Sequence, residues 1–98
     1  MESEPKRMND DEVSAAIEQL DGWRLVDGKL SREYVFSDFV EAIGFMVRTS
    51  IWAQVINHHP EWSNIYNVVR VDLHTHDVGG ISDYDFHLAA KMNELCER

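Results

Sequence analysis

The chain has 98 residues, 44% of them hydrophobic and 10% aromatic, and its nine basic and eighteen acidic side chains give a formal net charge of −9. These values are typical of a single globular domain, which we place at residues 9–98 after a disordered stretch at residues 1–8. The charge and the short apolar runs disfavour direct nucleic-acid binding, a membrane span and a signal peptide, and the lone Cys96 excludes an internal disulfide, so we expect a soluble cytoplasmic protein.

The first third of the chain predicts a short helix followed by a hairpin. Asn9, with Glu12 three residues later, is typical of a capping box that opens a helix. The apolar face of this helix continues to about residue 20, and Gly22 suits its end. The dipeptide Asp27-Gly28 then predicts a tight turn between two strands.

A long second helix carries apolar residues on two opposite sides. It begins after a cap at Ser37 or Asp38, runs to about Ile56 and has to end before Pro60, because the residue preceding a proline disfavours helical angles. One side is a broad stripe and the other a smaller cluster: Phe39, Val40, Ile43, Met46, Val47 and Ile51 against Phe45, Trp52 and Ile56. One set can cover a sheet. The other is either covered by neighbouring helices of the same chain or mediates self-association into a homodimer or homotetramer.

A second hairpin brings distant histidines together. Two strand-like runs surround a turn that we place at residues 67–68. With this turn, Trp62 lies opposite Leu73, and His59 lies opposite His76. Directly opposed residues have Cβ atoms about 5 Å apart, so the hairpin returns His76 to the neighbourhood of the earlier histidines.

The last part of the chain predicts a third helix. The Gly79-Gly80 pair interrupts the chain, and Ser82 with Asp85 three residues later resembles a second capping box. The complete order is helix, hairpin, helix, hairpin, helix. This order predicts an α+β fold, in which three helices pack on one face of a four-stranded antiparallel sheet.

Four of the five histidines, namely His58, His59, His74 and His76, flank the second hairpin. Imidazole has an ordinary pKa of about 6.5 and can give and take protons near neutrality, which favours acid/base catalysis. A plainer interpretation places the first two beyond a helix end, where the dipole favours them. Another interpretation is a zinc site formed by His74, His76 and either His58 or His59, but no cysteine or carboxylate is clearly placed to act as a further ligand. We therefore expect neither a metal nor a cofactor.

Together these motifs resemble the pterin-4a-carbinolamine dehydratase family, also known as dimerisation cofactor of a homeodomain transcription factor. The resemblance covers most of the chain, and its specificity comes from the combination of motifs rather than from any one. The motifs are Trp23, Tyr34-Val35-Phe36, Gly44-Phe45-Met46, His58-His59-Pro60-Glu61-Trp62, Tyr66-Asn67, Thr75-His76 and Asp85.

The resemblance implies dehydration of 4a-hydroxytetrahydropterin to quinonoid dihydropterin, which recycles the cofactor of aromatic amino-acid hydroxylases. It implies that His58, His59 and His76 are the acid, the base and the hydroxyl-binding group, each proton transfer contributing about 10²–10⁴-fold. The implied substrate-binding residues are Asn57, Trp62, His74, Thr75 and Asp77, with Gln54 and Asp85 in supporting positions. Asp85 also sits where a capping box needs an acid, so a structural role is equally consistent with its position.

Gln54 departs from the family pattern, because many members carry Glu at this position. It precedes His58 by four residues on the same helix, so we expect it to lie under His58. An amide can hold an imidazole by a hydrogen bond, but it does not favour the protonated ring as a carboxylate does.

The alternative function belongs to another class: a protein-binding module that stabilises a transcription-factor dimer through the second helix. The resemblance carries this alternative, since some members of the family do this as well as catalysis. Such a partner would extend the expected location to the nucleus.

Overall fold

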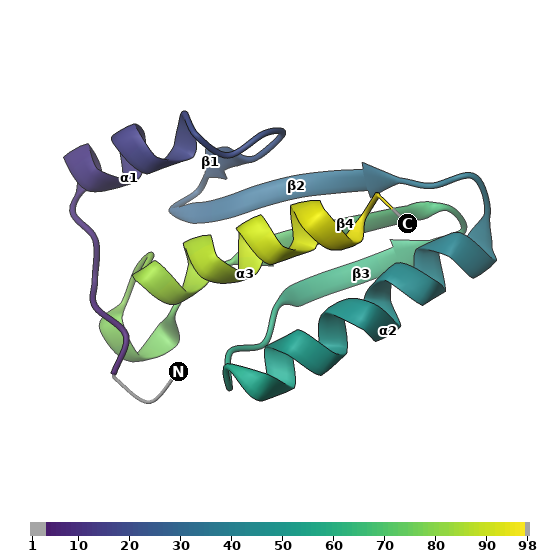
Figure 1. Ribbon diagram of the computed structural model, residues 1–98. Coiled ribbons are helices and arrows are strands. Elements are labelled where there is room, and N and C mark those ends of the chain that lie inside the picture. Colours follow the sequence, from purple (N-terminus) through teal and green to yellow (C-terminus); the bar gives the residue numbers. More distant parts are fainter. Residues whose placement is uncertain (1–3, 98) are drawn as a thin grey trace.

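The computed structural model describes residues 4–97 and contains, in that range, three α-helices, four strands and one short 3₁₀-helix (Figure 1). The strands form one antiparallel sheet of order β1-β2-β4-β3, so the predicted α+β fold is confirmed. Among the described residues, no helix is long and apolar enough to cross a membrane. The elements are α1 Asp10–Ile17, β1 Arg24–Val26, β2 Lys29–Val35, α2 Phe39–Val55, β3 Glu61–Ile65, β4 Val68–Leu73, η1 His76–Val78 and α3 Asp83–Leu95.

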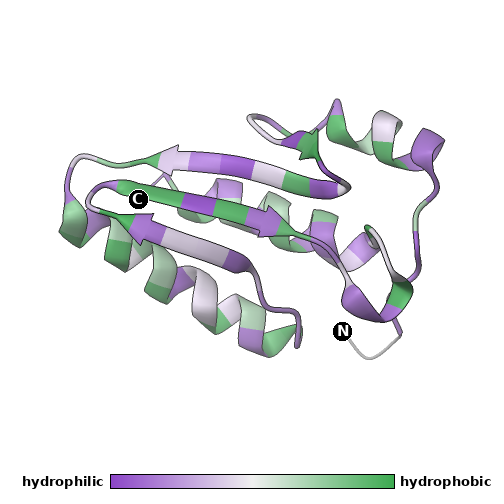
Figure 2. Ribbon diagram, turned by 180° about the vertical axis from the view of Figure 1, so that it is seen from behind, coloured by the Kyte–Doolittle hydropathy of each residue, from purple (hydrophilic) through white to green (hydrophobic). Residues whose placement is uncertain are grey.

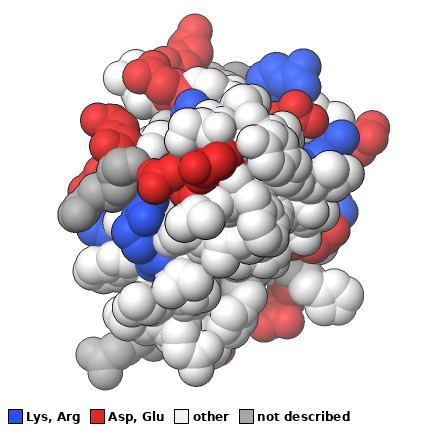
Figure 3. Space-filling view, turned by 90° about the vertical axis from the view of Figure 1, so that its right-hand side faces the viewer, with Lys and Arg blue, Asp and Glu red and all other residues white. Residues whose placement is uncertain are grey.

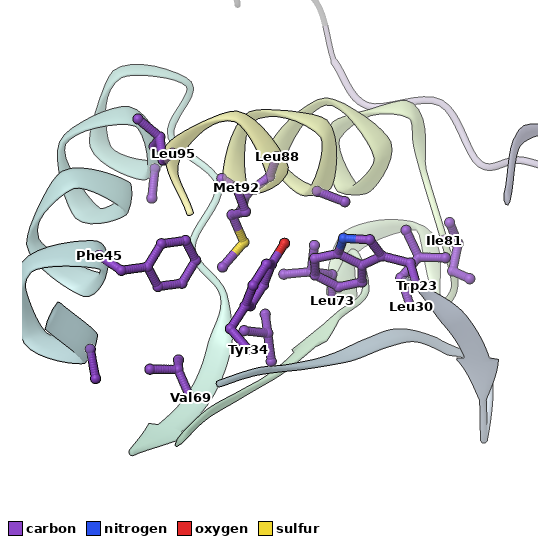
Figure 4. Close-up of a cluster of buried hydrophobic side chains, with 14 of the residues drawn as sticks. Trp23, Leu30, Tyr34, Phe45, Val69, Leu73, Ile81, Leu88, Met92 and Leu95 are labelled. Atoms are coloured by element: carbon purple, nitrogen blue, oxygen red, sulfur yellow. The ribbon is translucent and has the colours of Figure 1, made fainter. Parts of the chain in front are cut away.

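Helices α2 and α3 lie side by side over one face of the sheet, and α1 lies near β1 at one end of it (Figure 1). In the part of the chain that the structure describes, no helix covers the opposite face, which is turned toward the viewer in Figure 2. Side chains alternate across the strands. The buried ones face the helices, as Figure 4 shows for Leu30, Tyr34, Val69 and Leu73 beneath Leu88 and Met92 of α3.

Local signals placed the helix starts and the first turn correctly. Asn9 and Glu12 form the predicted capping box, each side chain accepting the other's backbone N–H at 2.9 Å. The turn at Asp27 and Gly28 has φ angles of 50° and 78°, as a tight hairpin turn requires. α1 is shorter than predicted: the helix ends at Ile17, and the chain continues in turns before β1.

The register predicted for the second hairpin is wrong by two residues. The turn lies at residues 66–67, one position earlier than predicted, and Trp62 pairs with Val71. Tyr66 adopts a φ of 50°, which sequence does not indicate for a tyrosine. The amide of Asn64 stabilises this turn by donating to two of its carbonyl oxygens at 3.0 and 2.9 Å.

The disorder predicted for the first eight residues is wrong for residues 6–8. The backbone N–H of Met8 donates to the carbonyl of Ile81 at 2.9 Å, and that of Lys6 donates to the carboxylate of Asp83 at 2.9 Å. The first three residues, which the same prediction included, lie outside the described part of the chain. The start of the domain is therefore tied to the segment that opens α3.

The broad apolar stripe of α2 faces solvent except at Met46, which packs against the core, and the side toward the core is formed by Ala42, Phe45, Thr49 and Ala53. Val40 and Ile51 of the stripe are 73% and 61% exposed. The alternative in which neighbouring helices of the same chain cover the stripe is therefore wrong. Figure 3, which views the molecule from the side where α2 begins, shows a broad area free of charged side chains.

A polar cluster closes the core beside α3. The side-chain oxygen of Asn93 accepts hydrogen bonds from the indole of Trp23 at 3.0 Å, from Arg32 at 2.6 Å and from the hydroxyl of Tyr34 at 2.6 Å. Its amide nitrogen donates to the carbonyl of Asp21 at 3.0 Å. Burial raises the pKa of Tyr34, so its hydroxyl keeps the proton that it donates. One carboxamide thus joins α3 to β2 and to the segment before β1.

Candidate active site

Four histidines surround one open pocket of about 280 Å³. Two chain segments build it, one after α2 and one after β4, and its lining is Asn57, His58, His59, His74, Thr75, His76 and Asp77. The structure therefore brings together all of the predicted catalytic histidines and all of the predicted substrate-binding residues except Trp62.

The end of α2 sets the direction of the first two histidines. Asn57 has a φ of 53°, and its N–H donates to the carbonyl of Gln54 at 3.2 Å. The N–H of His58 donates to the carbonyl of Ala53 at 3.0 Å. These two bonds form a Schellman motif, in which one left-handed residue reverses the chain at the helix end.

His58 turns inward to a fully buried carboxylate. Its Nε2 lies 2.6 Å from Oδ1 of Asp85, and the side chains are 11% and 0% exposed. The other oxygen of Asp85 accepts from the hydroxyl of Thr75 and the backbone N–H of Ser82, both at 2.9 Å. A neutral imidazole that faces an ionised carboxylate through Nε2 carries its proton on that nitrogen, and Nδ1 is then the proton acceptor.

Asp85 both caps α3 and contacts His58. It is the third residue of α3 and forms the predicted capping box with Ser82. The same carboxylate orients His58, which comes from a segment 27 positions earlier in the chain. Thr75, predicted to bind substrate, lines the pocket and donates a hydrogen bond from its hydroxyl to Asp85.

Gln54 lies beside His59, not under His58 as predicted. Its side-chain oxygen is 3.0 Å from Nε2 of His59. The prediction assumed that the helix continues through His58. The chain instead reverses at Asn57, which directs His58 toward α3 and leaves His59 above the last turn of α2.

His74 belongs to a charged group that the sequence analysis missed. Its Nε2 lies 2.8 Å from Oε1 of Glu61, and the same oxygen lies 2.9 Å from Nζ of Lys29. The hydrogen bond from Lys29, and then that from His74, lower the pKa of Glu61. The hydrogen bond to Glu61 likewise raises the pKa of Lys29. The hairpin register would have been the signal, since it brings these strand ends to one end of the sheet.

Of the two remaining predicted site residues, His76 lines the pocket and Trp62 does not. His76 begins the short helix η1, which the sequence analysis did not predict, and its exposed ring makes no hydrogen bond within residues 4–97. Trp62 pairs with Val71 on the helix-covered face and packs against the core. Trp62 therefore does not line the pocket.

No group of three or more histidine, cysteine, aspartate or glutamate side chains in residues 4–97 is arranged to hold a metal ion. The zinc alternative considered from sequence therefore lacks a ligand set in this region. Three of the pocket imidazoles, those of His58, His59 and His74, each have a different hydrogen-bond partner.

Comparison with known proteins gives concordant matches. The profile of the family described as Pterin 4 alpha carbinolamine dehydratase matches residues 6–95. A protein of that name from Solibacter usitatus is 47% identical over 89 residues, covering 91% of this chain and 94% of its own. One from Ruegeria pomeroyi is 53% identical over 77 residues, covering 76% and 79%. The crystal structure of a transcriptional coactivator/pterin dehydratase from Brucella melitensis superposes with a TM-score of 0.90 at 41% identity, covering 93% of this chain and 99% of that chain.

Proposed function

The chain belongs to the pterin 4 alpha carbinolamine dehydratase family, and from this premise we propose that it removes water from 4a-hydroxytetrahydropterin to give quinonoid dihydropterin. The observation that carries the proposal is the convergence of His58, His59 and His76 on one pocket. The buried Asp85 holds the first of them in a fixed orientation. Reduction of the product elsewhere would return a tetrahydropterin, so the reaction fits a recycling role in the cytoplasm.

The reaction needs two proton transfers and no change of oxidation state. One proton goes to the C4a hydroxyl, whose bond to carbon breaks as water leaves. Another leaves a ring nitrogen, whose electron pair forms the new double bond. With Nε2 of a neutral His58 donating to Asp85, its Nδ1 would accept a proton, and the exposed ring of His76 can exchange protons with solvent. Each transfer contributes about 10²–10⁴-fold to the rate of such a reaction.

The purified chain should accelerate dehydration of chemically generated carbinolamine without added metal or nucleotide. We expect the rate to be unchanged by a chelator, because imidazoles alone can move both protons. The measurement is the absorbance of the quinonoid product against the uncatalysed rate. His87→Ala, which changes the histidine that does not line the pocket, is the matched control and should keep full activity. Loss of activity in chelator and its recovery with zinc would contradict the proposal.

A coactivator function, the alternative from sequence, is not favoured. The Brucella melitensis protein is described by both terms, but the family and the curated relatives reported above are named for the dehydratase alone.

We also propose that the chain self-associates through the exposed stripe of α2. Val47 and Ile51 in this stripe are 55% and 61% exposed, and apolar area of this extent is rare on monomers. Light scattering at micromolar concentration should give a dimeric or tetrameric mass, and the double variant Val47→Asp/Ile51→Asp should give a monomer. Val35→Asp, on the helix-free sheet face, should leave the mass unchanged. A monomeric mass for the unaltered chain would overturn this proposal.

A further inference from the structure

Lys29, Glu61 and His74 meet because of how three strands end. β2 begins at Lys29, β3 begins at Glu61, and β4 finishes one residue before His74. Since β4 runs antiparallel to both neighbours, these positions fall at the same end of the sheet. The pair Leu30 and Leu73, extended by one step, places Lys29 opposite His74. Side-chain alternation directs all three to the helix-free face.

Glu61 is the centre of this group. Its Oε1 receives both the ammonium of Lys29 at 2.9 Å and the imidazole of His74 at 2.8 Å. The lowered pKa of Glu61 keeps its carboxylate ionised at neutral pH, and such a group only accepts hydrogen bonds. A neutral His74 must therefore place its proton on Nε2, and Nδ1 carries the lone pair.

We propose that Lys29 and Glu61 are positioning residues for His74, which they hold with Nδ1 as a hydrogen-bond acceptor for an N–H group of the substrate. His74 lines the same pocket as the three predicted catalytic histidines. This inference rests on the proposed function, since the heterocycle of a pterin presents N–H donors. It assigns a role to two residues that do not line the pocket themselves.

The group differs from an ordinary surface ion pair in its link to the pocket. Arg70 and Asp72 form a pair on the same sheet face, with 3.9 Å between Nε and Oδ2 and no pocket residue involved. Exposed pairs of that kind contribute little to stability. In the pair of Lys29 and Glu61, the acceptor oxygen also binds the imidazole of His74, which lines the pocket. Removal of Glu61 would therefore let the His74 ring rotate more freely.

The first test needs no activity. Nitrogen-15 NMR of histidine-labelled protein, recorded well above the ordinary histidine pKa of about 6.5, reports which ring nitrogen of His74 is protonated. We expect one tautomer, protonated on Nε2, and averaged shifts of two exchanging tautomers in Glu61→Ala. Averaged shifts in the unaltered chain, or the same single tautomer in the variant, would overturn the proposal.

The second test is kinetic. Loss of one oriented hydrogen bond to the substrate corresponds to about a 3–10-fold loss of affinity. Glu61→Ala should therefore raise KM by this factor and change kcat less than about 2-fold. Lys29→Met should have a smaller effect in the same direction, with recovery in Lys29→Arg. Arg70→Met is the matched control, and its KM should not change.

A double variant separates positioning from a purely structural role. If Glu61 acts through His74, then Glu61→Ala should not raise KM further in a His74→Ala background. Additive effects on KM would overturn the proposal. An inactive unaltered chain would instead refute the proposed function, and the tautomer measurement would still decide the role of Glu61.

Discussion

Replacing Asp85 with alanine should lower the free energy of unfolding by about 3 kcal/mol and reduce kcat for dehydration by about 100-fold. The carboxylate is fully buried and accepts from His58, Thr75 and the backbone of Ser82. Its removal leaves buried donors without a partner and frees the imidazole that it orients. Urea denaturation and steady-state kinetics of the same preparation measure the two effects.

Two further variants make this test specific. Asp83→Ala removes a half-buried carboxylate from the same first turn of α3, and its expected loss of stability is below about 1 kcal/mol. Asp85→Asn keeps the shape of the side chain, so it should recover much of the stability but not the rate. Normal kcat in a folded Asp85→Ala protein would contradict the assignment of Asp85 as the group that orients His58.

Replacing Asn93 with alanine should lower the free energy of unfolding by about 2–3 kcal/mol. The carboxamide accepts from Trp23, Arg32 and Tyr34, and it donates to a backbone carbonyl before β1. Alanine leaves the partly buried indole N–H of Trp23 and hydroxyl of Tyr34 without this acceptor, and it also removes this polar link between α3 and the sheet. Thermal and urea denaturation followed by tryptophan fluorescence report the change, because Trp23 is itself a member of the cluster.

The neighbouring residue provides the control for this prediction. Glu94 has a side chain that is 70% exposed and forms only a long ion pair with Lys91, at 3.7 Å. Glu94→Ala should change the free energy of unfolding by less than about 0.5 kcal/mol. Equal effects of the two alanine variants would show that the cluster around Asn93 does not carry the stability assigned to it.

The parts of the fold that were predictable are those specified by neighbouring residues. The pair Ser82 and Asp85 is readable as a capping box, because the side chain and the backbone that it caps are three positions apart. The turn at Asp27-Gly28 is readable because few residues accept positive φ. The order of helices and hairpins follows from such local signals.

The details of the site were not predictable, because they depend on two residues with unusual backbone angles. Tyr66 and Asn57 both adopt positive φ, although the residue type alone does not require this conformation at either position. The first shifts the register of the second hairpin by two residues, so that Trp62 pairs with Val71. The second exchanges the partners of the paired histidines, so that Gln54 meets His59 and Asp85 meets His58. The neighbourhood of the histidines was predictable, but their individual partners were not.

The contact between the first residues and the start of α3 also bears on how the chain folds. Lys6 and Asp83 are 77 positions apart, and Asp85 joins segments 27 and 10 positions away. Closing such long loops reduces chain entropy before the new contacts compensate for it, which slows folding. During synthesis on a ribosome, His58 cannot contact the carboxylate of Asp85 until Asp85 has left the exit tunnel. The pocket should therefore be among the last regions to become native during synthesis.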